Sequence, residues 1–406
     1  MRHDLSVRSL VRDRLKSLAK QMSAWDATPR IDEKEEEWIR ESITPFDHCT
    51  YQENLVIGGV DGTGDFPTLS YSDSFIYITL AQATRYAASR ATGLREIDPE
   101  LEPLIEFTWL PSDDAQAHRA LEDTFTRLVG LSIIDTIEAS DYRTIRAAST
   151  GGTADIRSLA NGLIRPHASD SGNLAIQLRS TAEFAAALRL IKSEATPDFV
   201  LVDTTFSLPF VGRKDNSLFF EHVKRLCCVE ARNRSCGFFG LSKSHGLPAA
   251  ERLNQLAAEK LGGSQAASAE HWFIRIPDQK MDGWSLSLLE NRQVPPIGAV
   301  SYLVRFHKNV PLMRLDMDLE YWMTNVKGRD AEETSKHERR IFEALDYASH
   351  DQRAFGYPYP IKAGHDRASL TQAERLALRK MIIHEAVAAG MRPQLFRNVS
   401  QATGHG

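Results

Sequence analysis

Two aspartates, Asp61 and Asp203, each stand at the end of an apolar run that reads as a buried strand, 54–61 (NLVIGGVD) and 198–203 (DFVLVD). A carboxylate at the mouth of a buried strand is costly unless it is paired or bound to a metal. If the two strands are neighbours, both carboxylates lie at one edge of a sheet and offer the oxygen ligands that Mg²⁺ and Mn²⁺ prefer. Two such ions about 4 Å apart can clamp the attacking and leaving oxygens of a phosphodiester. Either aspartate alone is explained as well by a helix cap or a turn, so the pair carries the prediction.

A glutamate and a lysine are candidates to complete such a site. Glu183 lies on an amphipathic helix predicted over 177–195, directly before the second of these strands, and alanines and a phenylalanine flank it. A glutamate in that setting faces inward more often than an average one, although an ordinary helix-surface acid is the competing interpretation. Lys243 closes the short apolar run 237–243 (GFFGLSK), where it either neutralises a phosphate or is an ordinary lysine at a strand end.

A proline-rich segment near the C-terminus, FGYPYPIKAGHDRA at 355–368, presents Tyr357 and His365. Two prolines exclude a helix over 355–360 and predict an extended or turn segment there. His365 has the chemistry of a metal ligand or of a general acid near neutral pH, although a single histidine is more often structural.

The surrounding pattern mixes strands and helices. Besides the strands named above, apolar and β-branched runs predict a strand over 68–80, antiparallel to the first, and a strand pair over 300–307 and 312–318. Residues 149–174 are rich in Ser, Gly, Asn and Asp and predict loops or a short helix. Helical periodicity predicts helices over 1–24, 30–42, 81–91, 115–140, 177–195, 215–234, 249–261, 330–348 and 370–390.

Composition excludes several classes of protein. Of the 406 residues, 42% are hydrophobic and 25% are charged, as in a globular chain rather than a disordered one. A net charge of −5 provides no bulk basic field for coating nucleic acid, although a local basic channel is compatible with it. No apolar run approaches the roughly 18 residues of a membrane span, and the basic N-terminal stretch lacks the features of a secretory signal. We therefore expect a cytoplasmic protein that does not engage a membrane.

The four cysteines form no CxxC pair. Cys227 and Cys228 are adjacent and are poorly placed to share a zinc tetrahedron with Cys49 and Cys236. We expect all four to be small buried hydrophobic residues in a reducing compartment.

In this order the motifs resemble the NurA nuclease family. The matching segments are VIGGVDGTG (56–64), the helix that carries Glu183, FVLVDTTFSLPF (199–210), GLSKS (240–244), SYLVRFHKNVPLMRLDMD (301–318) and GYPYPIKAGH (356–365). The last is the most specific, and together they span residues 54–375. Two positions depart from the family pattern, since Thr63 stands for the usual serine and Thr204 for a glycine, but neither change removes a carboxylate.

The resemblance implies an RNase H-like α/β core, with a mixed central sheet flanked by helices, and a Mn²⁺- or Mg²⁺-dependent DNA nuclease of the two-metal type. It further implies single-strand endonuclease and 5′-to-3′ exonuclease activity, a homodimer, and a HerA-type hexameric ATPase that moves duplex DNA into the nuclease. The biological setting would be DNA end processing or anti-phage defence. Carried over by position, the metal-binding residues would be Asp61, Glu183, Asp203 and His365, with Lys243 near the scissile phosphate and Tyr357 as the loop tyrosine.

We expect a helical N-terminal segment over 1–45 that contacts a partner or a second copy. A nuclease domain would follow over 46–390, with an insertion near 113–173, and then a flexible tail over 391–406. Two alternatives stay open. One is a catalytically weak scaffold subunit that docks on the ATPase ring and delivers DNA to another effector, and the other is a nuclease of the same fold directed at RNA.

Overall fold

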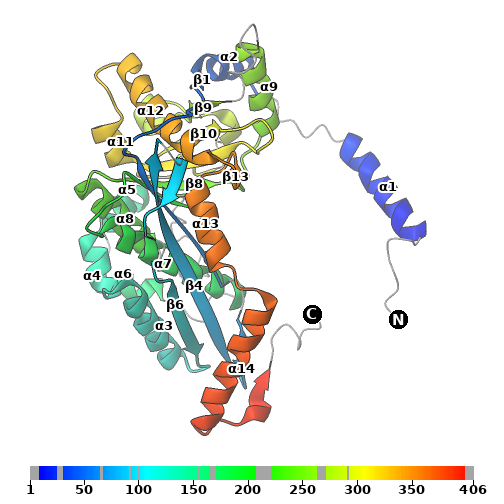
Figure 1. The fold of residues 1–406 in the computed structure, drawn as a ribbon, viewed down its shortest axis with the longest axis vertical. Coiled ribbons are helices and arrows are strands. Elements are labelled where there is room, and N and C mark those ends of the chain that lie inside the picture. Colours follow the sequence, from blue (N-terminus) through cyan, green and yellow to red (C-terminus); the bar gives the residue numbers. More distant parts are fainter. Residues whose placement is uncertain are drawn as a thin grey trace.

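The structure, a computed structural model, describes residues 9–24, 31–64, 67–90, 93–98, 101–153, 155–164, 171–206, 221–262, 271–289 and 292–397. Within these ranges a large mixed sheet runs through the molecule and helices surround it (Figure 1).

Five strands form the centre of the sheet, in the spatial order β6 (Leu104–Leu110), β4 (Ser74–Ser89), β2 (Val56–Thr63), β7 (Phe199–Val202) and β8 (Gly237–Ser242). Strands β2, β4 and β6 pair antiparallel, whereas β7 and β8 run parallel to β2. The first of the five in the chain therefore lies in the middle, and each parallel strand is reached through a helix, as parallel pairing requires. This arrangement confirms the expected mixed α/β fold with an RNase H-like core.

The sheet extends beyond this centre on both sides. Past β8 it continues antiparallel through β11 (Met313–Asp318), β10 (Ala299–Arg305), β9 (Trp272–Arg275) and β1 (Thr44–Pro45), which confirms the predicted strand pair β10 and β11. On the other side β4 pairs with β5 (Gly93–Glu96) and with β3 (Leu69–Tyr71), and β3 pairs with β14 (Phe396–Arg397). Strand β14 belongs to the segment expected as a flexible tail, of which 398–406 lie outside the described residues.

The helix predicted over 81–91 is wrong, because β4 continues to Ser89. The stretch is rich in alanine, which favours helices, but β4 is paired along both edges, to β2 on one and to β6 and β5 on the other. Pairing and burial within a sheet outweigh that local preference. Strand β6 was not predicted, because its exposed positions Ile105, Phe107 and Trp109 are themselves apolar and hide the alternation.

Two helices cover opposite faces of β2. Helix α7 (Ser171–Ile191) is buried along most of its length and packs against β2, β4 and β7. A Cβ on Gly58 would meet the Leu190 side chain of α7, whereas a Cβ on Gly59 would collide with the Pro360 backbone of α13 (Tyr359–Ala368). Successive side chains of a strand point to opposite faces, so α7 lies on one face and α13 on the other. Gly59 thus permits the close approach of α13 to the strand that carries Asp61.

The expected insertion region is helical and packs on the centre of the fold. Its first helix contacts α7 and β6, and its second and third contact α8 (Glu221–Asn233). The predicted short helix within 149–174 is present as α6. The helices described before α7 in this region are α3 (Asp114–Val129), α4 (Ile133–Ala139), α5 (Tyr142–Thr150) and α6 (Ile156–Leu163).

The remaining elements lie along the part of the sheet beyond β8 or toward the two ends of the described chain. Helix α2 (Glu33–Ser42) contacts α9 (Ala250–Leu261) and β9, so part of the expected N-terminal segment joins the main body. The others are α1 (Ser9–Ala24), α10 (Gln279–Asp282), α11 (Leu319–Asn325), α12 (Ala331–Ser349), α14 (Gln372–Ala388), the hairpin β12 (His350–Asp351) and β13 (Ala354–Phe355), and short 3-10 turns at Ser287–Leu289 and Pro393–Leu395.

Three of the four cysteines behave as expected. Cys227, Cys228 and Cys236 are buried and free, and burial raises the pKa of the Cys236 thiol to about 12. Cys49 is free as well but only half-buried, which corrects the expectation for this residue. In the part of the chain that the structure describes, no helix combines the length and apolar character needed to cross a membrane.

Candidate active site at the ends of strands β2 and β7

The two aspartates singled out from the sequence lie at neighbouring strand positions. Strands β2 and β7 are parallel, and Val60 stands beside Val202. Asp61 and Asp203 are the next residues after these two valines, so they lie side by side at the same edge of the sheet. Burial raises the pKa of the Asp203 carboxyl above its usual value, and the charge of Asp61 raises it further. The edge therefore holds two carboxylates close enough to repel each other, a condition that a bound cation relieves.

Lys243 partly offsets this repulsion. It follows β8, the strand beside β7, and its Nζ lies 3.4 Å from Oδ2 of Asp203. The lysine lowers the pKa of Asp203, but burial remains the larger effect and the net shift is upward. Because the Lys243 side chain is 45% exposed, its ammonium group can also reach a ligand from solvent.

Tyr357 lies against both of these residues. The Lys243 ammonium sits 4.0 Å from the centre of the tyrosine ring, a cation–π contact. The hydroxyl is buried beside Asp203, and its interaction with the carboxylate lowers the pKa of Asp203. Burial, followed by the Asp203 charge, raises the pKa of this hydroxyl well above its usual value, so it stays protonated.

His365 pairs with the other aspartate. Its Nδ1 lies 2.8 Å from Oδ2 of Asp61, while Oδ1 of Asp61 accepts a hydrogen bond from the Gly62 N–H at 2.7 Å. The imidazole is 56% exposed, whereas the carboxylate is largely buried. The pairing depends on α13, which is anchored to the sheet where the Thr84 hydroxyl donates to the Pro360 carbonyl at 2.8 Å.

The expectation that 355–360 contains no helix is wrong at its end. Helix α13 begins at Tyr359 and includes Pro360 in its first turn. Proline is tolerated there because the first N–H groups of a helix have no partner within the helix. The turn before it, at Gly356 with φ of +73°, sets Tyr357 beside the lysine.

Glu183 reaches the same strand from the other side. It is buried on α7, and Oε1 lies 3.3 Å from the Arg179 Nε one turn earlier. A Cβ on Gly62 would stand 2.9 Å from the Glu183 Cγ, so the glutamate packs directly on the residue after Asp61. Alternation along β2 turns Gly62 and Asp61 to opposite faces, so Glu183 approaches the strand from the α7 face and His365 from the α13 face.

The structure thus brings the six predicted residues to one region, without a single tight ligand set. Where the chain is described, a group of three or more His, Cys, Asp or Glu residues with ligand atoms within 4.8 Å of one another occurs elsewhere, at His48, His271, Asp346 and His350. Asp61, Glu183, Asp203 and His365 do not form such a group among the described residues. The carboxylate oxygens still suit hard cations such as Mn²⁺ and Mg²⁺.

Two supporting residues escaped the sequence prediction. Arg179 holds Glu183, and its i,i+4 spacing on a predicted helix was a usable signal. Asp316 on β11 is fully buried and its Oδ2 accepts a 2.7 Å hydrogen bond from the Phe206 N–H, which fixes the loop after Asp203. No local sequence pattern predicts that contact, because the two residues meet only in the folded sheet.

Comparisons with known proteins give similarity at the level of fold. No family model matches the chain, and no curated protein matches it. The chain is similar to the crystal structure of the NurA nuclease from Sulfolobus solfataricus, at 11% identity and a TM-score of 0.48, over 94% of this chain and 96% of that one. It is also similar to a structure of NurA with manganese (12% identity, TM-score 0.36, 95% and 99% covered) and to one of NurA bound to dAMP and manganese (12%, 0.35, 96% and 98%).

Proposed function

We propose that this protein is a metal-dependent DNA nuclease whose active site lies at the ends of β2 and β7. One observation carries the proposal: two ion pairs, Asp61 with His365 and Asp203 with Lys243, stand on adjacent positions of parallel strands. Paired carboxylates beside a cationic residue match what hydrolysis of a phosphodiester needs, namely metal ligands and charge neutralisation.

The donor set fits Mn²⁺ or Mg²⁺. Asp61 and Asp203 would be the central ligands, with Glu183 and His365 at the margins, and the raised pKa of Asp203 marks a place where added positive charge is favourable. When bound, the metal would activate water and stabilise the leaving oxygen, in the two-ion manner if both positions fill.

The protein's own groups have separate tasks. Lys243 would neutralise the charge that develops on the scissile phosphate, held in place by the Tyr357 ring. His365 would orient Asp61 and is exposed enough to give a proton to the leaving group. Tyr357 keeps a protonated hydroxyl beside Asp203, where it can donate to an oxygen of the substrate or of a bound water.

A basic surface next to this edge supports DNA as the substrate. Arg375 and Arg379 of α14 line a surface pocket of about 190 Å³ together with Thr63, which belongs to the same strand as Asp61. Guanidinium groups bind phosphate oxygens well, and these two arginines supply local positive charge in a chain whose net charge is negative. Within this proposal the activities are single-strand endonuclease and 5′-to-3′ exonuclease cleavage.

The proposal extends to partners through the family resemblance: a homodimer, a HerA-type hexameric ATPase, and a cytoplasmic role in end processing or anti-phage defence. Exposed apolar side chains support subunit contacts of this kind. Ile105, Phe107 and Trp109 form a row on β6, and Leu10 and Leu15 are exposed on α1 within the expected N-terminal segment.

A scaffold role without cleavage is the second candidate. It is favoured by one observation, that Glu183 approaches β2 from the face opposite to Asp61, so that the three acids do not converge tightly. Such a subunit would bind DNA and the ATPase but hydrolyse nothing.

A cleavage assay separates the two. Labelled single- and double-stranded DNA would be incubated with the protein in Mn²⁺, Mg²⁺ or EDTA, with and without the ATPase, beside Asp61→Asn and Asp203→Asn. Asp73→Asn, an exposed aspartate in the turn between β3 and β4, is the matched control. Metal-dependent cleavage that is lost in the first two variants and kept in the third supports the nuclease. Absence of cleavage in every condition, with DNA binding intact, favours the scaffold.

A further inference from the structure

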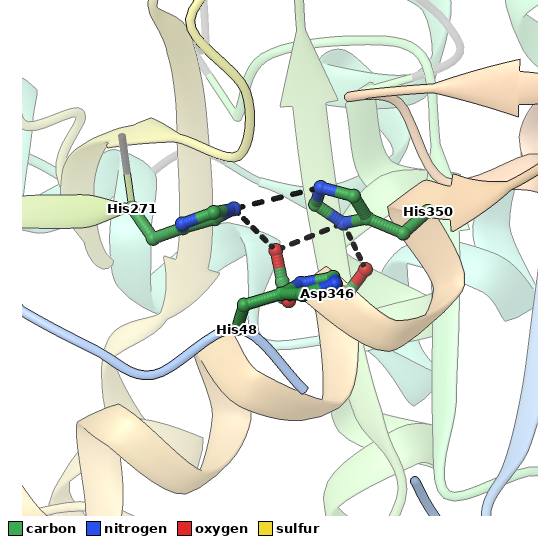
Figure 2. Close-up of side chains that lie close together, drawn as sticks. All are labelled: His48, His271, Asp346 and His350. Atoms are coloured by element: carbon green, nitrogen blue, oxygen red, sulfur yellow. Dashed lines mark hydrogen bonds and ion pairs between the residues drawn. The ribbon is translucent and has the colours of Figure 1, made fainter. Parts of the chain in front are cut away.

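A second group of side chains that can bind a metal lies beside the start of strand β9 and the end of helix α12, apart from the proposed active site. It consists of His48, His271, Asp346 and His350, whose ligand atoms all lie within 4.8 Å of one another. Figure 2 shows the imidazoles of His271 and His350 on either side of the Asp346 carboxylate, with His48 beside it. The four residues come from three separate parts of the chain: the segment before β2, the start of β9, and the junction of α12 with β12.

The separations match those of ligands around one small metal ion. Nε2 of His271 lies 3.5 Å from Nε2 of His350 and 3.6 Å from Oδ1 of Asp346. With bonds of about 2.0–2.1 Å, two ligands of a tetrahedral zinc ion stand about 3.3 Å apart.

The two oxygens of the Asp346 carboxylate have different surroundings. The side chain is fully buried, and Oδ2 accepts the Cys49 N–H at 2.8 Å and faces His48 Nδ1 at 2.8 Å. Oδ1 is buried and lies near two imidazole nitrogens, His350 Nδ1 at 3.1 Å and His271 Nε2 at 3.6 Å, but neither of these meets it with hydrogen-bond geometry. A buried carboxylate oxygen that accepts no hydrogen bond is costly, and a cation between it and the imidazoles removes that cost.

The surroundings of His350 also orient its imidazole in the way that is usual for a metal ligand. Nδ1 of His350 lies 3.0 Å from the Asp346 carbonyl, one helical turn back. If Nδ1 donates there, Nε2 carries the lone pair and points at His271, and a metal-bound histidine commonly donates its other N–H in this way. His350 also lines a surface pocket of about 660 Å³, and the His48 side chain is 41% exposed, so an ion has a path from solvent.

We propose that His48, His271, Asp346 and His350 bind one zinc-class divalent ion. Zinc accepts imidazole nitrogen and carboxylate oxygen as ligands, and four protein ligands would complete its tetrahedral coordination, which leaves no position open for a substrate. The ion would tie the segment before β2 to the edge of the sheet and to the α12–β12 junction. Because the β12–β13 hairpin leads into Gly356 and Tyr357, the site would also stabilise the approach to the proposed active site.

The test is zinc binding by the full-length protein, purified without a polyhistidine tag and stripped with a chelator. We expect elemental analysis and calorimetry with Zn²⁺ alone to give one ion per chain, and Co²⁺ to give the intense visible bands of tetrahedral coordination. His48→Ala, at the most exposed ligand, should weaken zinc binding by at least about tenfold. His307→Ala is the matched control, since its ring lies 6.1 Å from that of His350 without belonging to the group.

Several results would overturn the proposal. They are no stoichiometric zinc at micromolar concentration, octahedral Co²⁺ spectra, or equal zinc affinity in wild type, His48→Ala and a folded His350→Gln variant. The proposal is independent of the nuclease proposal, and Asp61→Asn with Asp203→Asn should keep the zinc. A protein that binds zinc but cleaves nothing, or the reverse, therefore tells the two proposals apart.

Discussion

Nδ1 of His365 lies 2.8 Å from Oδ2 of Asp61 although 304 residues separate them in the chain. The contact exists because α13 lies flat on β2, where Gly59 leaves room for the helix backbone. A partly buried carboxylate and an exposed imidazole thereby form a pair that can hold a metal or move a proton.

Replacing His365 tests this pair. We expect His365→Ala to lower DNA cleavage in Mn²⁺ by about 10²–10⁴-fold, the usual contribution of a positioned acid or base. Stability should change little because the imidazole is exposed. Single-turnover rates measure the effect, and His384→Ala, an exposed histidine on α14, should cleave like wild type. An equal loss in both variants would remove His365 from the site.

Because the pKa of Asp203 is raised, replacing its carboxyl should stabilise the fold by an amount that depends on pH. The native state holds a proton on this carboxyl more tightly than the unfolded chain does, so stability falls as pH rises from the unfolded pKa through the folded one. Asp203→Asn should therefore raise the melting temperature in EDTA at neutral pH, and the gain should shrink toward about pH 4.

Thermal unfolding from pH 4 to 8 measures that difference. Mn²⁺ should stabilise the wild type and not the variant, because the carboxylate is a proposed ligand. A variant less stable than wild type at neutral pH would mean that the ion pair with Lys243 outweighs burial.

Two substitutions of Tyr357 separate the role of its ring from that of its hydroxyl. Tyr357→Phe keeps the contact with Lys243 and removes the hydroxyl that interacts with Asp203, so we expect a loss of unfolding free energy of about 1–2 kcal/mol. Tyr357→Ala also empties a buried site and should cost about 3–5 kcal/mol. Urea denaturation measures both. Slower cleavage by a stable Tyr357→Phe would assign the hydroxyl a part in the reaction.

A substitution of Gly62 tests the position of Glu183. A methyl group there would stand 2.8 Å from the Leu80 carbonyl and 2.9 Å from the Glu183 Cγ, so Gly62→Ala should destabilise the fold by about 1–3 kcal/mol and displace the glutamate. Gly152→Ala is the control, since its Cβ meets no atom within 4 Å. Calorimetric unfolding and Mn²⁺ affinity are the readouts. Unchanged affinity in a destabilised Gly62→Ala would exclude Glu183 as a ligand.

The candidate active site was predictable to a large extent because its residues sit at the ends of regular elements. Apolar runs that end in Asp61, Asp203 and Lys243 are local signals, and the strands they predict are present as β2, β7 and β8. The predicted helix around 81–91 failed because its alanine-rich sequence favours a helix locally, whereas two neighbouring strands decide the conformation of β4.

The sequence by itself determined the chemical inventory and the strand ends that carry it, because apolar periodicity and turn residues act over short distances. Only the tertiary structure decided which residues meet. It paired Asp61 with His365, turned Glu183 to the other face of β2, and gathered His48, His271, Asp346 and His350, none of which the motifs had singled out. Such contacts join residues far apart in the chain, and they depend on strand register and helix packing, which no local pattern encodes.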